Sequence, residues 1–200
     1  MGISSLFICA ALEGQEGANH AIVDFHQATY WHSLGITQLD RAGCDYFRLV
    51  EEPSECALPR LAKQGETYDF CFIDGWYTFD HTLLDFFYVD RLLDVGGIVA
   101  IDDVGWSSIK KVIRYISNYP NYKSIGHVPR TVKRGFAGYL YKGIALASRA
   151  IAKVFQTPRL CCIFSDKLIV PNSQLVLEST MLALQKTGDG IPKLGLVCRF

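Results

Sequence analysis

Apolar and polar positions follow two alternating patterns along the first 128 residues. Apolar residues at helical spacing predict helices over residues 3–12, 29–42, 54–64, 78–93 and 107–117. Short apolar runs between them predict strands over residues 21–23, 46–50, 68–73, 98–101 and 122–128. Strands that alternate with helices in this way are typical of a parallel sheet. We therefore expect an α/β fold in which helices cover both faces of the sheet.

The last third of the chain is less regular. Residues 136–155 mix apolar and basic positions and predict a basic amphipathic helix. Two more apolar runs predict strands at residues 160–170 and 181–186.

The composition narrows the class of protein. Half of the 200 residues are apolar and 20% are charged, which excludes a disordered or collagen-like chain. No apolar run reaches the roughly 18 residues that a membrane-spanning helix requires. The first five residues lack the basic segment of a secretory signal. The seven Cys show no metal-ligand spacing, so we expect a cytoplasmic protein with reduced thiols.

The charges are unevenly distributed, although the formal net charge is zero. Residues 1–103 hold 17 acidic and 5 basic side chains, whereas residues 104–165 hold 11 basic and no acidic ones. One interpretation of the basic segment is the solvated face of two surface helices. The other is contact with a membrane surface or an anionic partner through residues 130–159. We expect no nucleic acid partner, because the acidic first half would repel a phosphate backbone.

Three of the predicted strands end in an acidic residue: Asp24, Asp74 and Asp102. Ligands of open α/β sheets bind beyond the carboxyl ends of the strands. We therefore expect these carboxylates to meet at one edge of the sheet and to line a ligand site. The alternative is that each Asp caps the helix that follows its strand.

Two segments resemble one enzyme family. Tyr68–Gly75 (YDFCFIDG) and Leu92–Asp103 (LLDVGGIVAIDD) are similar to the fourth and fifth strands of class I S-adenosylmethionine-dependent methyltransferases, in the small-molecule O-methyltransferase-like branch. The resemblance covers residues 2–128 and 180–187. It implies a Rossmann-like, mostly parallel sheet whose last strand, near residues 181–186, is antiparallel. We expect a single domain over residues 1–200, in which an insert over 129–179 covers the substrate pocket.

The resemblance implies S-adenosylmethionine as the cofactor. Asp24 would accept hydrogen bonds from both ribose hydroxyls, since an ionised carboxylate offers four lone-pair sites. Ser54 would lie beside the adenine, and Trp76 would pack against the cofactor. Gly2 and Ser4 correspond to the end of the family's glycine-rich loop. The implied cofactor-binding residues are Gly2, Ser4, Asp24, Ser54, Asp74 and Trp76.

The resemblance also implies a divalent cation. Asp74, Asp102 and Asp103 correspond to metal ligands in the catechol-type relatives, and their hard oxygen atoms suit Mg²⁺. Such an ion would lower the pKa of an acceptor hydroxyl. In the metal-free interpretation, Asp74 contacts the cofactor or caps a helix, and Asp102 and Asp103 cap the next helix.

The sequence departs from the family pattern in two places. The family's first strand and the first half of its glycine-rich loop have no counterpart before Gly2, so we expect a shortened chain. The alternative is a protein that replaces the strand in another way. No catalytic base is readable, because Trp76 and Tyr77 stand where relatives carry Lys or His; His81 and His26 are interpreted as structural and loop residues.

The predicted reaction is transfer of a methyl group to an oxygen, in preference to a nitrogen, of a small molecule. The main alternative is a non-catalytic relative that serves as a binding or partner subunit, and a homo-oligomer is a further hypothesis. A nicotinamide-dependent oxidoreductase would need a G-x-G-x-x-G motif, which the sequence lacks. A membrane-surface protein tethered by the basic helix is the remaining alternative.

Overall fold

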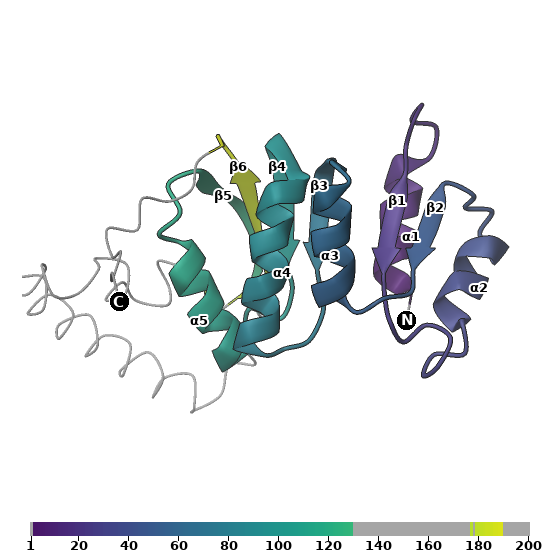
Figure 1. Cartoon of the computed structure of the whole chain (residues 1–200), viewed down its shortest axis with the longest axis horizontal. Helices are drawn as coiled ribbons and strands as arrows, with labels where there is room; N and C mark the ends of the chain where they lie inside the picture. The colour runs from purple at the N-terminus through teal and green to yellow at the C-terminus, as the bar shows by residue number, and fades with distance from the viewer. Residues whose placement is uncertain (1, 130–176, 178, 190–200) are drawn as a thin grey trace, which may run out of the picture. The chain divides into compact units, whose positions relative to one another are not determined.

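The structure is a computed structural model that describes residues 2–129, 177 and 179–189 (Figure 1). The chain forms two compact units, Met1–Gly65 and Glu66–Phe200, called here the N-terminal and C-terminal units. The predicted basic helix at 136–155, the strand at 160–170 and the insert over 129–179 lie outside the described residues, apart from a few positions at the ends of the insert. No helix in the described part of the chain is long and apolar enough to span a membrane.

The N-terminal unit is built on a two-stranded parallel sheet. Its elements are α1 (Ile3–Leu12), β1 (His20–Val23), α2 (Leu34–Arg41), β2 (Phe47–Val50) and α3 (Ser54–Lys63). The pairing of β1 with β2 runs from His20 opposite Phe47 to Val23 opposite Val50. α1 contacts both α2 and β1, and the Tyr46 hydroxyl donates to the Cys9 carbonyl of α1 at 2.6 Å. The two strands therefore end at the same edge of this sheet.

The prediction of a helix over residues 29–42 is wrong at its start, because α2 begins only at Leu34. His32 and Ser33 have φ angles of 47° and 55°, in the left-handed region that does not continue a right-handed helix. The Ser33 N–H donates instead to the Gln27 carbonyl at 2.6 Å. The residues that follow β1 thus form an ordered loop before α2.

The C-terminal unit contains a four-stranded sheet. Its elements are β3 (Tyr68–Ile73), α4 (Phe79–Leu92), β4 (Leu93–Ile101), α5 (Ser107–Ile116), β5 (Tyr122–Pro129) and β6 (Ser179–Lys186). The strand order is β3-β4-β6-β5. β3 and β4 are parallel, whereas β6 is antiparallel to both of its neighbours, β4 and β5. The fold is α/β and Rossmann-like, with mostly parallel strands and the reversed last strand that the resemblance implies.

The strands form two sheets where the sequence analysis expected one. Among the described residues, β1 pairs only with β2. In the same part of the chain, β3 pairs only with β4 and is the edge strand of the second sheet. Each of these strands therefore has an edge without a strand partner among the described residues, and the expectation of a shortened chain stays a prediction.

One apolar core holds the C-terminal unit together. α5 buries Ile109, Val112, Ile113 and Ile116, which follow the i, i+3, i+4, i+7 spacing of a single helix face. These side chains join residues of α4 and of strands β3, β4 and β6 in one cluster. Figure 1 shows α4 and α5 together in front of this sheet. The core therefore fixes where β3 and β4 end.

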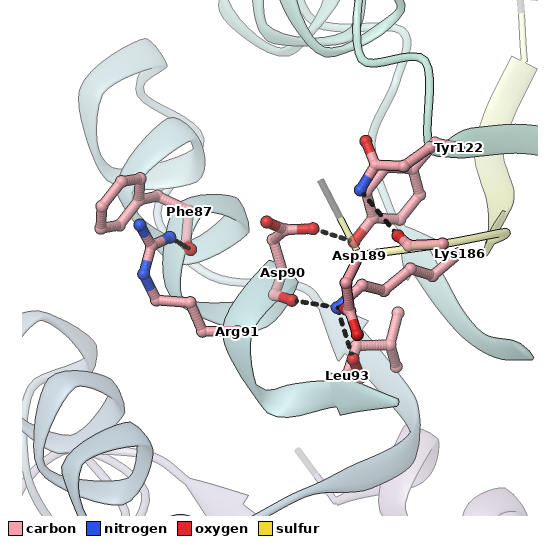
Figure 2. Close-up of polar contacts among 9 residues, drawn as sticks. Phe87, Asp90, Arg91, Leu93, Tyr122, Lys186 and Asp189 are labelled. Atoms are coloured by element: carbon pink, nitrogen blue, oxygen red, sulfur yellow. Dashed lines mark hydrogen bonds and ion pairs between the residues drawn. The ribbon is translucent and has the colours of Figure 1, made fainter. Parts of the chain in front are cut away.

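A buried lysine connects the last strand to the end of α4 (Figure 2). Lys186 is 5% exposed, and its Nζ donates to the carbonyls of Asp90 at 2.7 Å and Leu93 at 2.9 Å. It also forms an ion pair with Asp189 at 2.8 Å. The last carbonyls of a helix lack partners within the helix, and a cation there is favourable. Lys186 thus satisfies backbone groups at the junction of α4 and β4.

Replacing Lys186 by Met is expected to destabilise the protein by about 1–3 kcal/mol, because two carbonyls lose their charged donor. Urea denaturation measures the change in the free energy of unfolding. Lys123→Met is the matched control, because Lys123 lies on neighbouring β5 with an exposed side chain. Equal stabilities of the two variants would contradict the assigned role of Lys186.

Candidate cofactor and substrate site

Acidic side chains gather at the carboxyl ends of β3 and β4 in the C-terminal unit. Ile73, the last residue of β3, is paired with Ile101, the last residue of β4. The Asp102 N–H donates to the Ile73 carbonyl at 3.0 Å and continues the ladder by one residue. Asp74 and Asp102 therefore follow adjacent strands at the same edge, with Asp103 next to them. We call Asp74, Asp102 and Asp103 the carboxylate edge.

The carboxylate edge is a region of concentrated negative charge. Burial raises the pKa of Asp74, and the charges of Asp102 and Asp103 raise it further. Asp103 has a left-handed backbone, with φ at 51°, and its N–H donates to Asp102 Oδ1 at 2.8 Å. This turn holds the last two carboxylates close to the end of β4.

Helix capping does not account for these acidic residues. The N-cap of α4 is Thr78 and that of α5 is Trp106, neither of which is an acidic residue. In the N-terminal unit, the N-cap of α2 is Ser33 rather than Asp24. The interpretation in which these Asp residues cap the following helices is therefore wrong.

The predicted metal site has no direct counterpart in the structure. Within the described residues, no group of three or more His, Cys, Asp or Glu side chains is arranged to hold a metal ion. The carboxylate edge supplies the expected oxygen atoms, but metal binding by Asp74, Asp102 and Asp103 stays a prediction.

Two half-exposed aromatic rings connect the loops that follow β3 and β4. Tyr77 and Trp106 stack with ring centroids 5.5 Å apart and planes 10° apart. The Ser108 hydroxyl donates to the Tyr77 carbonyl at 2.5 Å. Burial raises the pKa of the Tyr77 hydroxyl, as do the nearby charges of Asp74 and Asp103. The sequence analysis did not single out Trp106, although its position three residues after Asp103 was the available signal.

Trp76 is held at the start of α4. Its ring is 60% exposed and stacks on His81 at 5.8 Å, and its carbonyl accepts a hydrogen bond from the Thr82 hydroxyl at 3.1 Å. His81 thus contacts the Trp76 ring, and its interpretation as a structural residue stays a prediction. Contact between Trp76 and a cofactor stays a prediction.

In the N-terminal unit, Asp24 directly follows β1 and organises the loop after it. Its Oδ1 accepts the His26 N–H at 2.8 Å, and its Oδ2 accepts the Gln27 side-chain amide at 2.6 Å. Glu51 follows β2 and accepts the Ala28 N–H at 2.8 Å. Two acidic side chains thus hold one loop at the carboxyl edge of the β1–β2 sheet.

The other predicted cofactor residues of this unit lie at helix starts. Gly2 is the N-cap of α1, and Ser4 lies in its first turn. A Cβ on Gly2 would lie 2.8 Å from the Gly35 Cα, so backbone packing alone requires glycine there. Ser54 is the first residue of α3 and not its N-cap, which is Pro53. Cofactor contacts by Gly2, Ser4 and Ser54 stay predictions.

Comparison with known families identifies the chain. The model of a family described as a methyltransferase domain matches residues 1–104. The chain belongs to this methyltransferase family. No curated protein sequence matches it.

Solved structures share the fold of this chain. Cofactor-bound Rv0187 from MTB is 18% identical, with a TM-score of 0.52 over 61% of this chain and 59% of that chain. The O-methyltransferase TomG from Streptomyces achromogenes, in complex with SAM, is 17% identical, with a TM-score of 0.52 over 62% and 61%. NSun6 from Pyrococcus horikoshii, with SFG, is 13% identical, with a TM-score of 0.55 over 94% and 46%. The chain spans about three fifths of the length of the first two.

The hydrogen-bond network around Asp24 in the N-terminal unit leaves acceptor atoms available. Each oxygen of Asp24 accepts one hydrogen bond within the loop, which leaves further lone pairs for hydroxyl donors. The Gln27 Oε1 atom, in the same network, is buried and has no hydrogen-bond partner among the described residues. The sequence analysis identified Asp24 but missed Gln27. Loop residues have no helical or strand periodicity, so the sequence does not indicate which of them is buried.

Asp74→Asn is expected to stabilise the protein near pH 7. The pKa of Asp74 in the folded protein is raised above its ordinary value of 3.8, so folding favours the protonated carboxyl. The stability that this proton contributes is complete below pH 3.8. The contribution is lost as the pH rises through the folded-state pKa, and an uncharged Asn avoids that loss. Thermal unfolding with a chelator present should show a higher midpoint for the variant at about pH 7 and no gain at about pH 3.

The control is Asp94→Asn, which removes an exposed carboxylate from β4, away from the carboxylate edge. It should leave the midpoint nearly unchanged at both pH values. A lower midpoint for Asp74→Asn at neutral pH would show that the Asp74 charge is stabilised in the fold, contrary to the repulsion inferred here.

Proposed function

We propose that the chain transfers a methyl group from S-adenosylmethionine to an oxygen, in preference to a nitrogen, of a small molecule. The observation that carries this proposal is the family match over residues 1–104, which takes in the end of β1 and both strands of the carboxylate edge. The likeness to solved structures supports the fold. The choice of oxygen and of a small acceptor rests on the resemblance of Tyr68–Gly75 and Leu92–Asp103 to O-methyltransferases.

The cofactor side of the proposal rests on the loop after β1. When bound, S-adenosylmethionine would supply the methyl group from its sulfonium centre. Asp24 would accept the ribose hydroxyls, and the backbone N–H of His26 and the amide of Gln27 hold its carboxylate in place. Because methyl transfer is an in-line displacement, fixing the cofactor against rotation contributes directly to the rate.

The acceptor side rests on the carboxylate edge and the rings beside it. A divalent cation held by Asp74, Asp102 and Asp103 would supply the charge that makes an acceptor hydroxyl easier to ionise. Trp76, Tyr77 and Trp106 offer exposed aromatic surface, which suits a planar acceptor. No side chain is assigned as the general base.

The predictions about partners and location come from the sequence. A small-molecule acceptor, the absence of a nucleic acid partner, a contact through residues 130–159, a homo-oligomer and a cytoplasmic location all stay predictions. The alternative is a non-catalytic relative that keeps the fold and serves as a partner subunit.

Calorimetric titration of the full chain with S-adenosylhomocysteine tests the cofactor assignment. Asp24→Ala is expected to weaken binding by at least about 10-fold, because charge-assisted hydrogen bonds to two hydroxyls are lost. Asp45→Ala is the matched control, since Asp45 is an exposed carboxylate of the same unit. Absence of binding by the unmodified chain would favour the non-catalytic alternative.

Titration with Mg²⁺ alone tests the metal assignment. Asp102→Asn should weaken Mg²⁺ binding by at least about 10-fold, because a hard oxygen ligand is replaced by a neutral amide. Asp69→Asn, which changes an exposed carboxylate on β3, should leave the affinity unchanged. Equal Mg²⁺ affinities for both variants would remove the carboxylate edge as a metal site.

A further inference from the structure

Gln27 is a buried polar residue that the resemblance does not explain. It lies in the loop after β1 and is only 5% exposed. Its Nε2 donates to Asp24 Oδ2 at 2.6 Å, whereas its Oε1 is buried without a hydrogen-bond partner among the described residues. Burying an acceptor without a donor is unfavourable. An apolar side chain of similar size would avoid this cost, so the amide needs a reason beyond packing.

The loop holds Gln27 in one position. Its carbonyl accepts the Ser33 N–H at 2.6 Å, just before α2. A Cβ on Gly35 would lie 3.1 Å from the Gln27 Oε1 and 3.3 Å from its Nε2. The glycine therefore gives the amide room to lie against the backbone of α2, and the loop leaves little freedom to turn the amide away from Asp24.

The donor that Gln27 offers has the right chemistry for orienting a carboxylate. A neutral amide fixes one oxygen of Asp24, and the His26 N–H fixes the other. A Lys or Arg in the same place would neutralise the carboxylate and compete with a ligand for it. An uncharged donor sets the direction of the remaining lone pairs and leaves the negative charge available.

We propose that Gln27 is a positioning residue that aims the free lone pairs of Asp24 at the two ribose hydroxyls of the cofactor. This inference rests on the proposed function, because it assumes that Asp24 binds the ribose. It predicts that Gln27 acts on recognition of the hydroxyl groups in particular and not on the stability of the unit in general.

The test compares two ligands on the full chain by calorimetry. One is S-adenosylhomocysteine, and the other is its analogue without the two ribose hydroxyls. The unmodified chain should bind the first at least about 10-fold more tightly. Gln27→Met, which keeps the size and removes the donor, should reduce this preference to less than about 3-fold. A merely structural role would weaken both ligands equally and keep the preference.

Two more variants make the comparison specific. Gln27→Glu keeps the shape and replaces the donor by a second carboxylate, so it should also lose the preference, even if Gln27→Met does not fold. Gln15→Met is the matched control, since Gln15 is an exposed glutamine of the same unit whose amide donates to the Ala11 carbonyl at 2.9 Å. It should keep the preference of the unmodified chain.

A measurement on the unmodified chain needs no variant to fold. In the ¹H–¹⁵N spectrum, S-adenosylhomocysteine should shift the side-chain amide signals of Gln27 and leave those of Gln15 in place. Folded Gln27 variants that keep the preference, or a Gln27 signal that does not move at saturation, would overturn the inference. If the unmodified chain binds neither ligand, the proposed function itself fails. That result differs from the two outcomes that would overturn the role of Gln27 alone.

Discussion

The parallel pairing of β3 with β4 determines where the charged groups of the C-terminal unit lie. Because side chains alternate along a strand, a slip of one residue would reverse every side chain between the two faces of the sheet. The pairing is irregular between the Tyr68–Leu93 and Phe70–Ile98 pairs, and Gly97 lies in this stretch of β4 without room for a side chain. A Cβ there would lie 2.9 Å from the Asp94 carbonyl and 3.0 Å from the Asp69 carbonyl of the neighbouring strand. The buried ends Ile73 and Ile101 then leave Asp74 and Asp102 side by side.

Two strand-ending Asp residues that look alike in the sequence have opposite surroundings in the structure. Asp24 receives two hydrogen bonds from its own loop, so its orientation is set by donors. Asp74 is exposed at the surface, but partial desolvation and the like charges of Asp102 and Asp103 raise its pKa and disfavour its ionised form. The first environment orients a carboxylate, and the second concentrates negative charge. The position of an acid after a strand therefore says where it lies but not what it is suited to bind.

Much of the fold could be predicted, because strong periodicity marked α1, α5 and β3 within a residue or so. α2 could not, since helical spacing from residue 29 gave no sign of the left-handed turn at His32 and Ser33. The acidic residues of the site could be predicted from the strand ends. Gln27 and Trp106 could not, because their roles depend on contacts made by folded loops. The predictions for the basic segment concern residues outside those described.

The strand order of the C-terminal unit governs when this part of the chain can fold. β6 lies between β4 and β5 and pairs with both, so β5 joins the sheet only when residues 179–186 are in place. Lys186 adds contacts to residues 93 and 96 positions earlier in the chain. Such distant contacts slow folding, because bringing together two segments far apart in the sequence costs loop-closure entropy. During synthesis on the ribosome, the edge of β4 that pairs with β6 therefore stays open until residues 179–186 have emerged.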